Sequence, residues 1–259
     1  MRGNLRRAAL AVALASAAGA LAGAQDAVVR QDGGIVRGPV DARRLALVFT
    51  GHEFAEGGTV ILDALARHGA KASFFLTGDF LRAPAFEPIV RRIVREGHYL
   101  GPHSDKHLLY CAWEAREQTL VTRDAFTRDL EDNLRAIEAS GVRRSGARYW
   151  LPAYEWYNAE ISAWSAGMGM TLVNFTPGTR SNADYAGETD RNFVPSRRIL
   201  DSILARERDD PHGLNGFILL LHIGAGPGRA DKMHNRLGEL LDELSRRQYR
   251  FVRVDDLLR

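Results

Sequence analysis

The chain has 259 residues, of which 45% are hydrophobic and 26% are charged. This balance is typical of a globular protein and excludes a disordered, collagen-like or multi-span membrane chain. The length allows one large domain or two small ones. The formal net charge of +3, from 35 Lys and Arg against 32 Asp and Glu, suggests a nucleic-acid or membrane-surface partner until the positions of the charges are considered.

The first 24 residues have the pattern of a secretory signal peptide. Three arginines precede an apolar stretch from Ala8 to Ala22, and a small-residue Ala-Gly-Ala sequence ends at Ala24. A retained membrane anchor is the alternative, but the stretch is shorter than the roughly 20 apolar residues that span a bilayer. Because the three arginines account for the whole excess of basic residues, the chain beyond Ala24 is formally neutral. We therefore expect an exported protein, periplasmic or secreted, with no stable membrane anchor and no nucleic-acid partner.

Residues 25–44 are expected to be a lead-in segment, and residues 45–259 a single domain in which apolar runs alternate with amphipathic stretches. In chain order we expect a strand at 45–49, a helix at 59–68, a strand at 72–76, a helix at 86–96, a strand at 98–101, a helix at 123–140, a strand at 147–150, a helix at 159–166, a strand at 171–174, a helix at 197–207, a strand at 217–221, a helix at 231–247 and a strand at 249–254. This order predicts an α/β fold whose parallel sheet is closed or nearly closed into a barrel of about seven strands. A doubly wound open sheet is the alternative.

Four of the eight histidines follow predicted strands, where the active sites of parallel α/β folds lie. They are His52, His103, His107 and His222. His103 and His107 are four residues apart, a spacing that places both imidazoles on one face of a helical turn and allows them to bind one metal ion. Imidazole ligands suit Zn first, with Ni, Co or Fe as alternatives. A pair of solvated surface histidines is the competing interpretation.

The loops after the strands at 45–49, 147–150 and 171–174 also carry charged and aromatic side chains. These are Glu53, Tyr154, Glu155, Trp156, Arg180, Asp184 and Tyr185. Aromatic faces stack on sugar rings, so Trp156 and Tyr185 are candidates for a glycan-binding groove. Arg180 and Asp184 could bind substrate or pair with each other. The one cysteine, Cys111, cannot form an internal disulfide, and its apolar neighbours favour packing over catalysis.

From about Gly34 to Leu257 the sequence resembles the polysaccharide deacetylases of carbohydrate esterase family 4. The resemblance depends on four matches to family motifs: His103-Ser-Asp-Lys-His107, Leu220-Leu-His222, the partial match Leu151-Pro-Ala-Tyr154, and Asp184-Tyr185. It implies a distorted parallel barrel, a metal ion held by one Asp and two His side chains, and an acetylated glycan as the substrate. The domain at 45–259 would then be the catalytic domain.

The sequence departs from the family at two chemically important places. The family's first motif, Thr-Phe-Asp-Asp, supplies a base and a metal-binding carboxylate, but here the strand ends in Phe-Thr-Gly at residues 49–51, followed by His52 and Glu53. Leu151 replaces the arginine that steers the base in the family. Two hypotheses follow: the site is rebuilt around His52 and Glu53, or the metal site is lost and the exported protein only binds glycans. We favour the rebuilt site, because two groups able to bind metal or accept protons stand next to the lost pair.

In the rebuilt site, a divalent ion on His52, His103 and His107 would polarise an acetyl carbonyl and activate a water molecule. His52 and Glu53 could exchange roles, because a glutamate is also a good ligand.

Proton transfer would involve two further groups. Glu53 would accept the proton of the water, with Glu155 as a second candidate base, and His222 would protonate the leaving amine or alcohol. A backbone N–H near Tyr154 would stabilise the oxyanion, as the resemblance implies. The predicted function is the metal-dependent removal of N- or O-acetyl groups from a polysaccharide or amino sugar.

Overall fold

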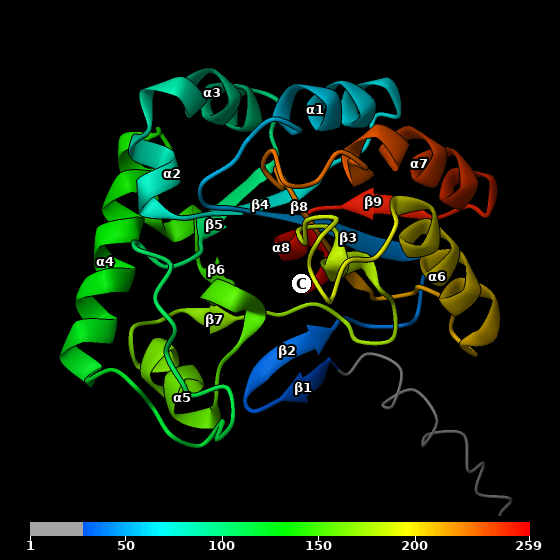
Figure 1. The fold of residues 1–259 in the computed structure, drawn as a ribbon. Helices are drawn as coiled ribbons and strands as arrows, with labels where there is room; N and C mark the ends of the chain where they lie inside the picture. Colours follow the sequence, from blue (N-terminus) through cyan, green and yellow to red (C-terminus); the bar gives the residue numbers. More distant parts are fainter. Residues whose placement is uncertain (1–27) are drawn as a thin grey trace, which may run out of the picture.

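The computed structural model describes residues 28–259, and the predicted signal peptide lies outside the described residues. Seven parallel strands form the centre of the fold (Figure 1). One sheet contains β5 (Tyr99–Pro102), β4 (Ser73–Leu76), β3 (Arg44–Gly51) and β8 (Ile218–His222) in that order, with β9 (Arg250–Val252) paired to the start of β3. A second parallel pair contains β6 (Tyr149–Trp150) and β7 (Thr171–Leu172). All seven overlap the predicted strands, and the α/β fold class is confirmed.

The parallel strands and an antiparallel hairpin form an incomplete ring. The hairpin, β1 (Val29–Gln31) and β2 (Gly34–Arg37), lies in the lead-in segment and was not predicted as strands. The Leu151 N–H donates to the Pro102 carbonyl at 3.1 Å and links β6 to β5. Isolated bridges connect β2 to the residue after β7 and to the residue before β8, at Ile35–Val173 and Arg37–Phe217. Within residues 28–259 the strands do not close into one continuous sheet, so the predicted barrel is incomplete.

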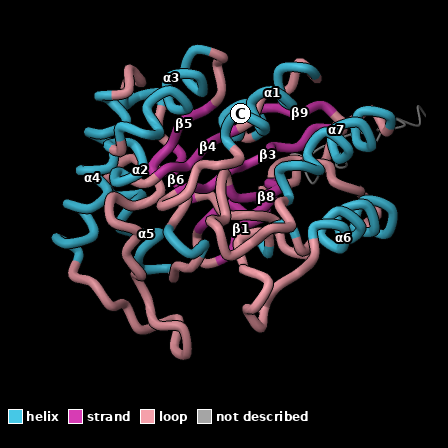
Figure 2. The backbone as a smooth tube through the Cα atoms, turned by 45° about the horizontal axis from the view of Figure 1, so that its top comes forward, coloured by secondary structure: helices cyan, strands magenta, loops and turns pink. Residues whose placement is uncertain are grey.

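Helices cover the outside of the ring (Figures 1 and 2). They are α1 (Gly58–Arg67), α2 (Gly78–Arg82), α3 (Glu87–Arg95), α4 (Arg123–Ala139), α5 (Ala159–Gly167), α6 (Ser196–Asp209) and α7 (Leu237–Arg246). The short helix α8 (Val254–Leu257) lies inside the ring near the carboxyl terminus (Figure 1). The sequence pattern predicted neither α2 nor α8. None of the helices in the described part of the chain has both the length and the apolar character that crossing a membrane requires.

The alternation of side chains along β3 explains its continuous apolar sequence. Leu45 and Phe49 pack outward against the helices, whereas Ala46 and Val48 pack inside the ring with α8. Both faces of the strand are therefore buried, as is usual for parallel sheets. Cys111 is also buried, which agrees with the packing role expected for it.

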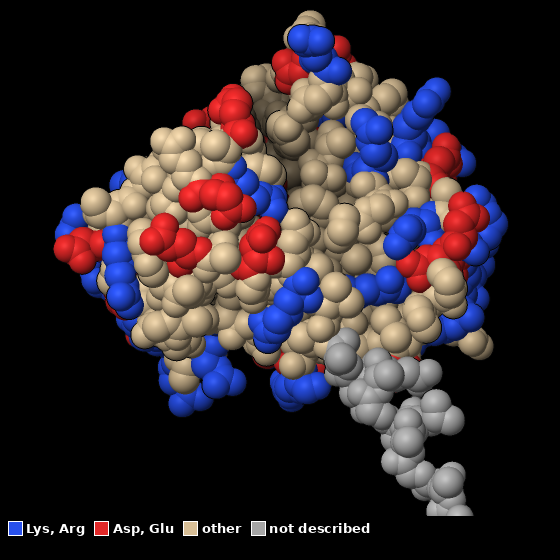
Figure 3. All heavy atoms as spheres, turned by 90° about the horizontal axis from the view of Figure 1, so that it is seen from below, with Lys and Arg blue, Asp and Glu red and all other residues tan. Residues whose placement is uncertain are grey.

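The two ends of the ring differ. At the amino-terminal end of the strands, the Val254 N–H of α8 donates to Ser73 Oγ at the first residue of β4, over 2.8 Å. The loops that carry the candidate residues lie at the opposite end, where the strands finish. Basic and acidic side chains are interspersed over the face of the described residues shown in Figure 3.

Candidate active site

A cavity of about 530 Å³ opens at the carboxyl-terminal ends of the strands. All four histidines predicted at strand ends line it, although they lie up to 170 positions apart in the chain. His52 follows β3, His103 and His107 follow β5, and His222 is the last residue of β8. Four further predicted residues also line it: Glu53, Tyr154, Glu155 and Tyr185. Eight of the residues that follow predicted strands therefore meet in one cavity.

The packing at the last residue of β3 leaves no room for a side chain at position 51. A Cβ atom at Gly51 would lie 2.6 Å from Ile223 Cγ2, well inside contact distance. The next residue, His52, lies on the cavity wall with Nδ1 3.2 Å from Thr77 Oγ1, the hydroxyl that caps α2. The side chain of Glu53 is mostly exposed, with Oε1 3.9 Å from His52 Nε2.

Two hydrogen bonds fix the position of His103. Its backbone N–H donates to Asn133 Oδ1 at 2.7 Å, and its ring Nδ1 lies 2.9 Å from the Leu151 carbonyl oxygen. Because a carbonyl only accepts, Nδ1 carries the proton and Nε2 keeps its lone pair. Asn133 also donates through Nδ2 to the Leu76 carbonyl at 3.1 Å, so α4 holds His103 to the end of β4.

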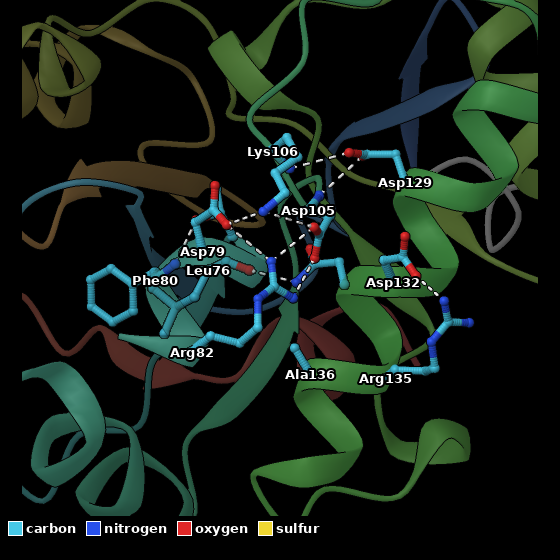
Figure 4. Close-up of polar contacts among 12 residues, drawn as sticks. Leu76, Asp79, Phe80, Arg82, Asp105, Lys106, Asp129, Asp132, Arg135 and Ala136 are labelled. Carbon is cyan, nitrogen blue, oxygen red and sulfur yellow. Dashed lines mark hydrogen bonds and ion pairs between the residues drawn. The ribbon is translucent and has the colours of Figure 1, made fainter. Parts of the chain in front are cut away.

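The loop after β5 that carries His103 and His107, called the histidine loop below, is anchored by α4 and α2 (Figure 4). The buried Asp129 carboxylate of α4 accepts the backbone N–H groups of Asp105 at 3.0 Å and Lys106 at 3.1 Å. The Asp105 carboxylate accepts two hydrogen bonds from the Arg82 guanidinium of α2, at 2.7 and 2.8 Å. Such charge-assisted bonds are stronger than neutral ones, so the loop backbone is firmly held.

Asp184 does not serve as the predicted substrate-binding residue. Its carboxylate is 4% exposed; Oδ1 lies 2.6 Å from His222 Nδ1, and Oδ2 accepts the His222 backbone N–H at 2.9 Å. Burial opposes the charging of His222, but the Asp184 carboxylate outweighs burial and raises the pKa of His222. Asp184 thus orients His222 and favours its protonated form. Arg180 lies outside the cavity, in a separate hollow beside α6, so its predicted role in this site is also corrected.

The two histidines spaced four apart are neutral in the folded protein. Burial, reinforced by the neighbouring His107, lowers the pKa of His103 far below its ordinary value. Burial, together with His52 and His222, lowers the pKa of His107 to about 3. Neutral imidazole is the form that binds a metal ion. The ring planes of His103 and His107 are inclined by 61° with centroids 5.2 Å apart, so the in-plane lone pairs of the two rings are not confined to parallel planes.

His52 does not complete a three-histidine metal site in this conformation. Its ring stacks on His107, with centroids 4.6 Å apart and 6° between the planes. The lone pairs of an imidazole lie in the ring plane, so those of two parallel stacked rings do not meet at one ion. Accordingly, no group of three His, Cys, Asp or Glu residues between 28 and 259 is placed to hold a metal ion. His103 and His107 remain the candidate ligands, and a third ligand from His52 or Glu53 would require a different orientation of that side chain.

A strained turn brings Tyr154 and Glu155 into the cavity. Their φ angles are 59° and 53°, in the left-handed region that residues other than glycine rarely adopt. Two hydrogen bonds hold the turn: the Glu155 N–H donates to the Pro152 carbonyl at 3.0 Å, and Asn174 Nδ2 donates to the Glu155 carbonyl at 2.8 Å. Burial raises the pKa of Glu155 to about 7, with His222 lowering it and Asp184 raising it further.

Exposed aromatic side chains surround the cavity. Of seven large hydrophobic residues that are exposed in the described chain, four line this cavity, and each is 40–50% exposed: Phe54, Trp113, Tyr154 and Tyr185. Phe54 and Trp113 were not predicted as site residues. Trp156 lies instead in an adjoining hollow of about 280 Å³, where the Arg116 guanidinium sits 3.8 Å from the centre of its ring. Trp156 therefore does not line the main cavity and has one face covered by Arg116, and its stacking role stays a prediction.

A family model for polysaccharide deacetylases matches residues 38–173, more than half of the chain. This chain belongs to the polysaccharide deacetylase family. A chitooligosaccharide deacetylase of Rhizobium leguminosarum bv. trifolii is 30% identical over 170 residues, which cover 64% of this chain and 65% of that protein. The chain spans less than two thirds of the length of the curated relatives that it matches first, between 25% and 65%.

Solved structures share the fold of this deacetylase-family chain. A family 4 acetyl xylan esterase from Clostridium thermocellum, in complex with a cobalt ion, has a TM-score of 0.64 and 19% identity, over 83% of this chain and 89% of the other. A carbohydrate esterase family 4 pseudoenzyme from Bacillus anthracis has a TM-score of 0.67 and 18% identity, over 89% of this chain and 70% of the other. The fold thus occurs both in esterases and in at least one pseudoenzyme.

Proposed function

We propose that this protein is a hydrolase that removes acetyl groups from an acetylated polysaccharide or amino sugar with the help of a divalent metal ion. The observation that carries the proposal is the convergence of four histidines and two glutamates on one cavity in a polysaccharide deacetylase-family chain. Acetylated glycans are favoured as substrates by the chitooligosaccharide deacetylase relative and the xylan esterase neighbour. The exposed aromatic rim suits the apolar faces of sugar rings.

In this proposal His103 and His107 hold the metal ion, with His52 or Glu53 as the third ligand. Zn is the first candidate and Ni, Co or Fe are alternatives; the cobalt ion in the esterase neighbour supports this class of metal. When bound, such an ion polarises a carbonyl group and lowers the pKa of water.

The protein's own groups then carry the protons. A carboxylate of the cavity, Glu53 or Glu155, accepts the proton of the attacking water. The Tyr154 backbone N–H donates no hydrogen bond within residues 28–259 and is available to the tetrahedral oxyanion. His222, held by Asp184, donates its proton to the leaving amine or alcohol as the acyl bond breaks.

A second candidate function is glycan binding without catalysis. It is favoured by one specific observation, the parallel stacking of His52 on His107, which leaves only two histidines arranged for a metal in the described chain. The pseudoenzyme among the structural neighbours shows that the fold is compatible with this outcome.

Acetate release from chitopentaose and from acetylated xylan tests the proposal. We expect His107→Ala to lower the rate at least about 100-fold, because it removes one metal-binding imidazole. His212→Ala is the matched control, since His212 is exposed and lies outside the cavity. Wild-type protein that binds these glycans but releases no acetate would instead support the binding function.

We also propose that the protein acts outside the cytoplasm, on the basis of the leader at residues 1–24. Mass spectrometry of protein from the periplasm or medium should give a mature chain that begins at Gln25. A full-length chain confined to the cytoplasm would contradict export.

A further inference from the structure

We propose that Glu155, rather than Glu53, is the general base that activates the attacking water. This inference rests on the proposed function and assigns a role that the function leaves open between two carboxylates. The two residues differ in how firmly the structure holds them, in their surroundings, and in the conformational strain that each position carries.

Hydrogen bonds hold the backbone at Glu155, whereas the side chain of Glu53 is mostly exposed. The Glu155 backbone makes two hydrogen bonds, to the Pro152 carbonyl and from the buried Asn174 amide. The Glu53 side chain is 68% exposed, and its nearest charged partner in the described chain is His52 at 3.9 Å. A general base must keep a fixed position relative to the water that it deprotonates, because proton transfer depends on hydrogen-bond contact. The fixed backbone at Glu155, with a side chain that is only partly exposed, meets this requirement better than the exposed Glu53 side chain.

The conformation of Glu155 is costly for any residue except glycine. Both Tyr154 and Glu155 have positive φ angles, and strain of this kind is retained mainly where it serves function. A glycine at position 155 would adopt φ 53° freely. A glutamate at this position, where glycine would remove the strain, supports a role for the side chain.

The Glu155 carboxylate is partly buried, lines the cavity and has no competing partner. Within residues 28–259 it accepts no hydrogen bond and forms no ion pair, so its oxygens are available to water. The charged groups that affect it are His222 and Asp184, from the facing side of the cavity. Burial raises its pKa to about 7, and a base is most effective when its pKa lies near the working pH.

The Glu155 carboxylate takes one proton from water while the water oxygen bonds to the acetyl carbon, and the carbonyl π electrons move to oxygen. As the oxyanion collapses, the bond to the leaving nitrogen or oxygen breaks, and His222 supplies the proton that this atom gains. The product leaves as acetic acid, which loses its remaining proton to solvent to become acetate, and the proton on Glu155 returns to His222 directly or through solvent.

Three variants of the full chain test the assignment: Glu155→Gln, Glu155→Gly and, as a matched carboxylate control, Glu114→Gln. Glu114 is exposed, beside Trp113 but not among the lining residues. We expect both substitutions at Glu155 to lower kcat for acetate release about 10²–10⁴-fold. Glu114→Gln should leave kcat unchanged. Because Glu155 does not hold the metal, both Glu155 variants should bind the same amount of Co²⁺ as wild type.

Glu155→Gly separates catalysis from folding. Glycine relieves the positive φ, so this variant should melt no lower than wild type while losing turnover. The assignment is overturned if either Glu155 variant, folded and loaded with metal, keeps kcat within about threefold of wild type. A wild-type protein that releases no acetate refutes the proposed function as a whole, whereas an active wild type with an active Glu155→Gln variant refutes only this assignment.

Discussion

Asp129 is the residue on which the histidine loop depends most. Its carboxylate is 6% exposed and accepts three hydrogen bonds, from the N–H groups of Asp105 and Lys106 and from the Tyr110 hydroxyl at 2.6 Å. Each hydrogen bond to a charged group contributes about 1.5–3 kcal/mol to stability. Removing the carboxylate leaves three donors without a partner, but water entry and a loop shift recover part of the loss. We therefore expect Asp129→Ala to lower the free energy of unfolding by about 3–5 kcal/mol.

Urea denaturation monitored by circular dichroism measures this loss, and Asp132→Ala provides the control. Asp132 lies on the same helix one turn further on, has a side chain that is 45% exposed and pairs only with Arg135 in the described chain (Figure 4). An exposed ion pair of this kind contributes about 0.2–1 kcal/mol, and the gain in helix propensity is the same for both substitutions. An Asp129→Ala variant within about 1 kcal/mol of Asp132→Ala would refute the anchoring role.

Three further outcomes are expected. Asp184→Asn should lower the pKa of His222, measured by NMR titration, because the carboxylate that outweighs burial is removed; an unchanged pKa contradicts the assigned pairing. With Glu155 as the base, kcat/KM should fall as pH drops below about 7, since the carboxylate must be ionised to accept a proton. Because burial raises the pKa of Glu155 from 4.5, the folded state disfavours its charge, and Glu155→Gln should melt higher than wild type above pH 7 but not below pH 4.5. Trp113→Ala should raise KM for chitopentaose with little change in melting temperature, and an unchanged KM excludes Trp113 from the glycan surface.

The sequence allowed the parallel strands and the main helices to be predicted because their signals are local. An apolar run such as 217–221 is buried on both faces, and the helix at 123–140 has a clear apolar stripe, which matches α4. The place where the ring stays open was not predictable, because it depends on contacts between β6, β7 and the β1–β2 hairpin that are distant in the chain. α8 was not predicted, since it has only four residues and no helical pattern can be recognised over so short a length; the predicted last strand overlaps it only at Val254.

Residues of the candidate site could be predicted from the sequence where they directly follow a predicted strand. This holds for the four histidines, which the structure brings to one cavity. Trp113 was not predicted as a site residue, because it lies on the long loop between β5 and α4, where no periodic pattern indicates direction. Asp184 was interpreted as a substrate residue because its contact with His222 spans 38 positions in the chain. The orientation of the side chains could not be predicted from the sequence either, as the stacking of the His52 ring on the His107 ring shows.

The central claim is that a site without the family's first acidic motif still hydrolyses acetyl groups. Its most direct test is acetate release from chitopentaose by purified protein, first stripped of metal with a chelator and then reconstituted with Zn²⁺ or Co²⁺. We expect the stripped protein to release no acetate, and acetate release to recover when about one ion per chain is bound. Reconstituted protein that binds chitopentaose and acetylated xylan but releases acetate from neither would contradict it.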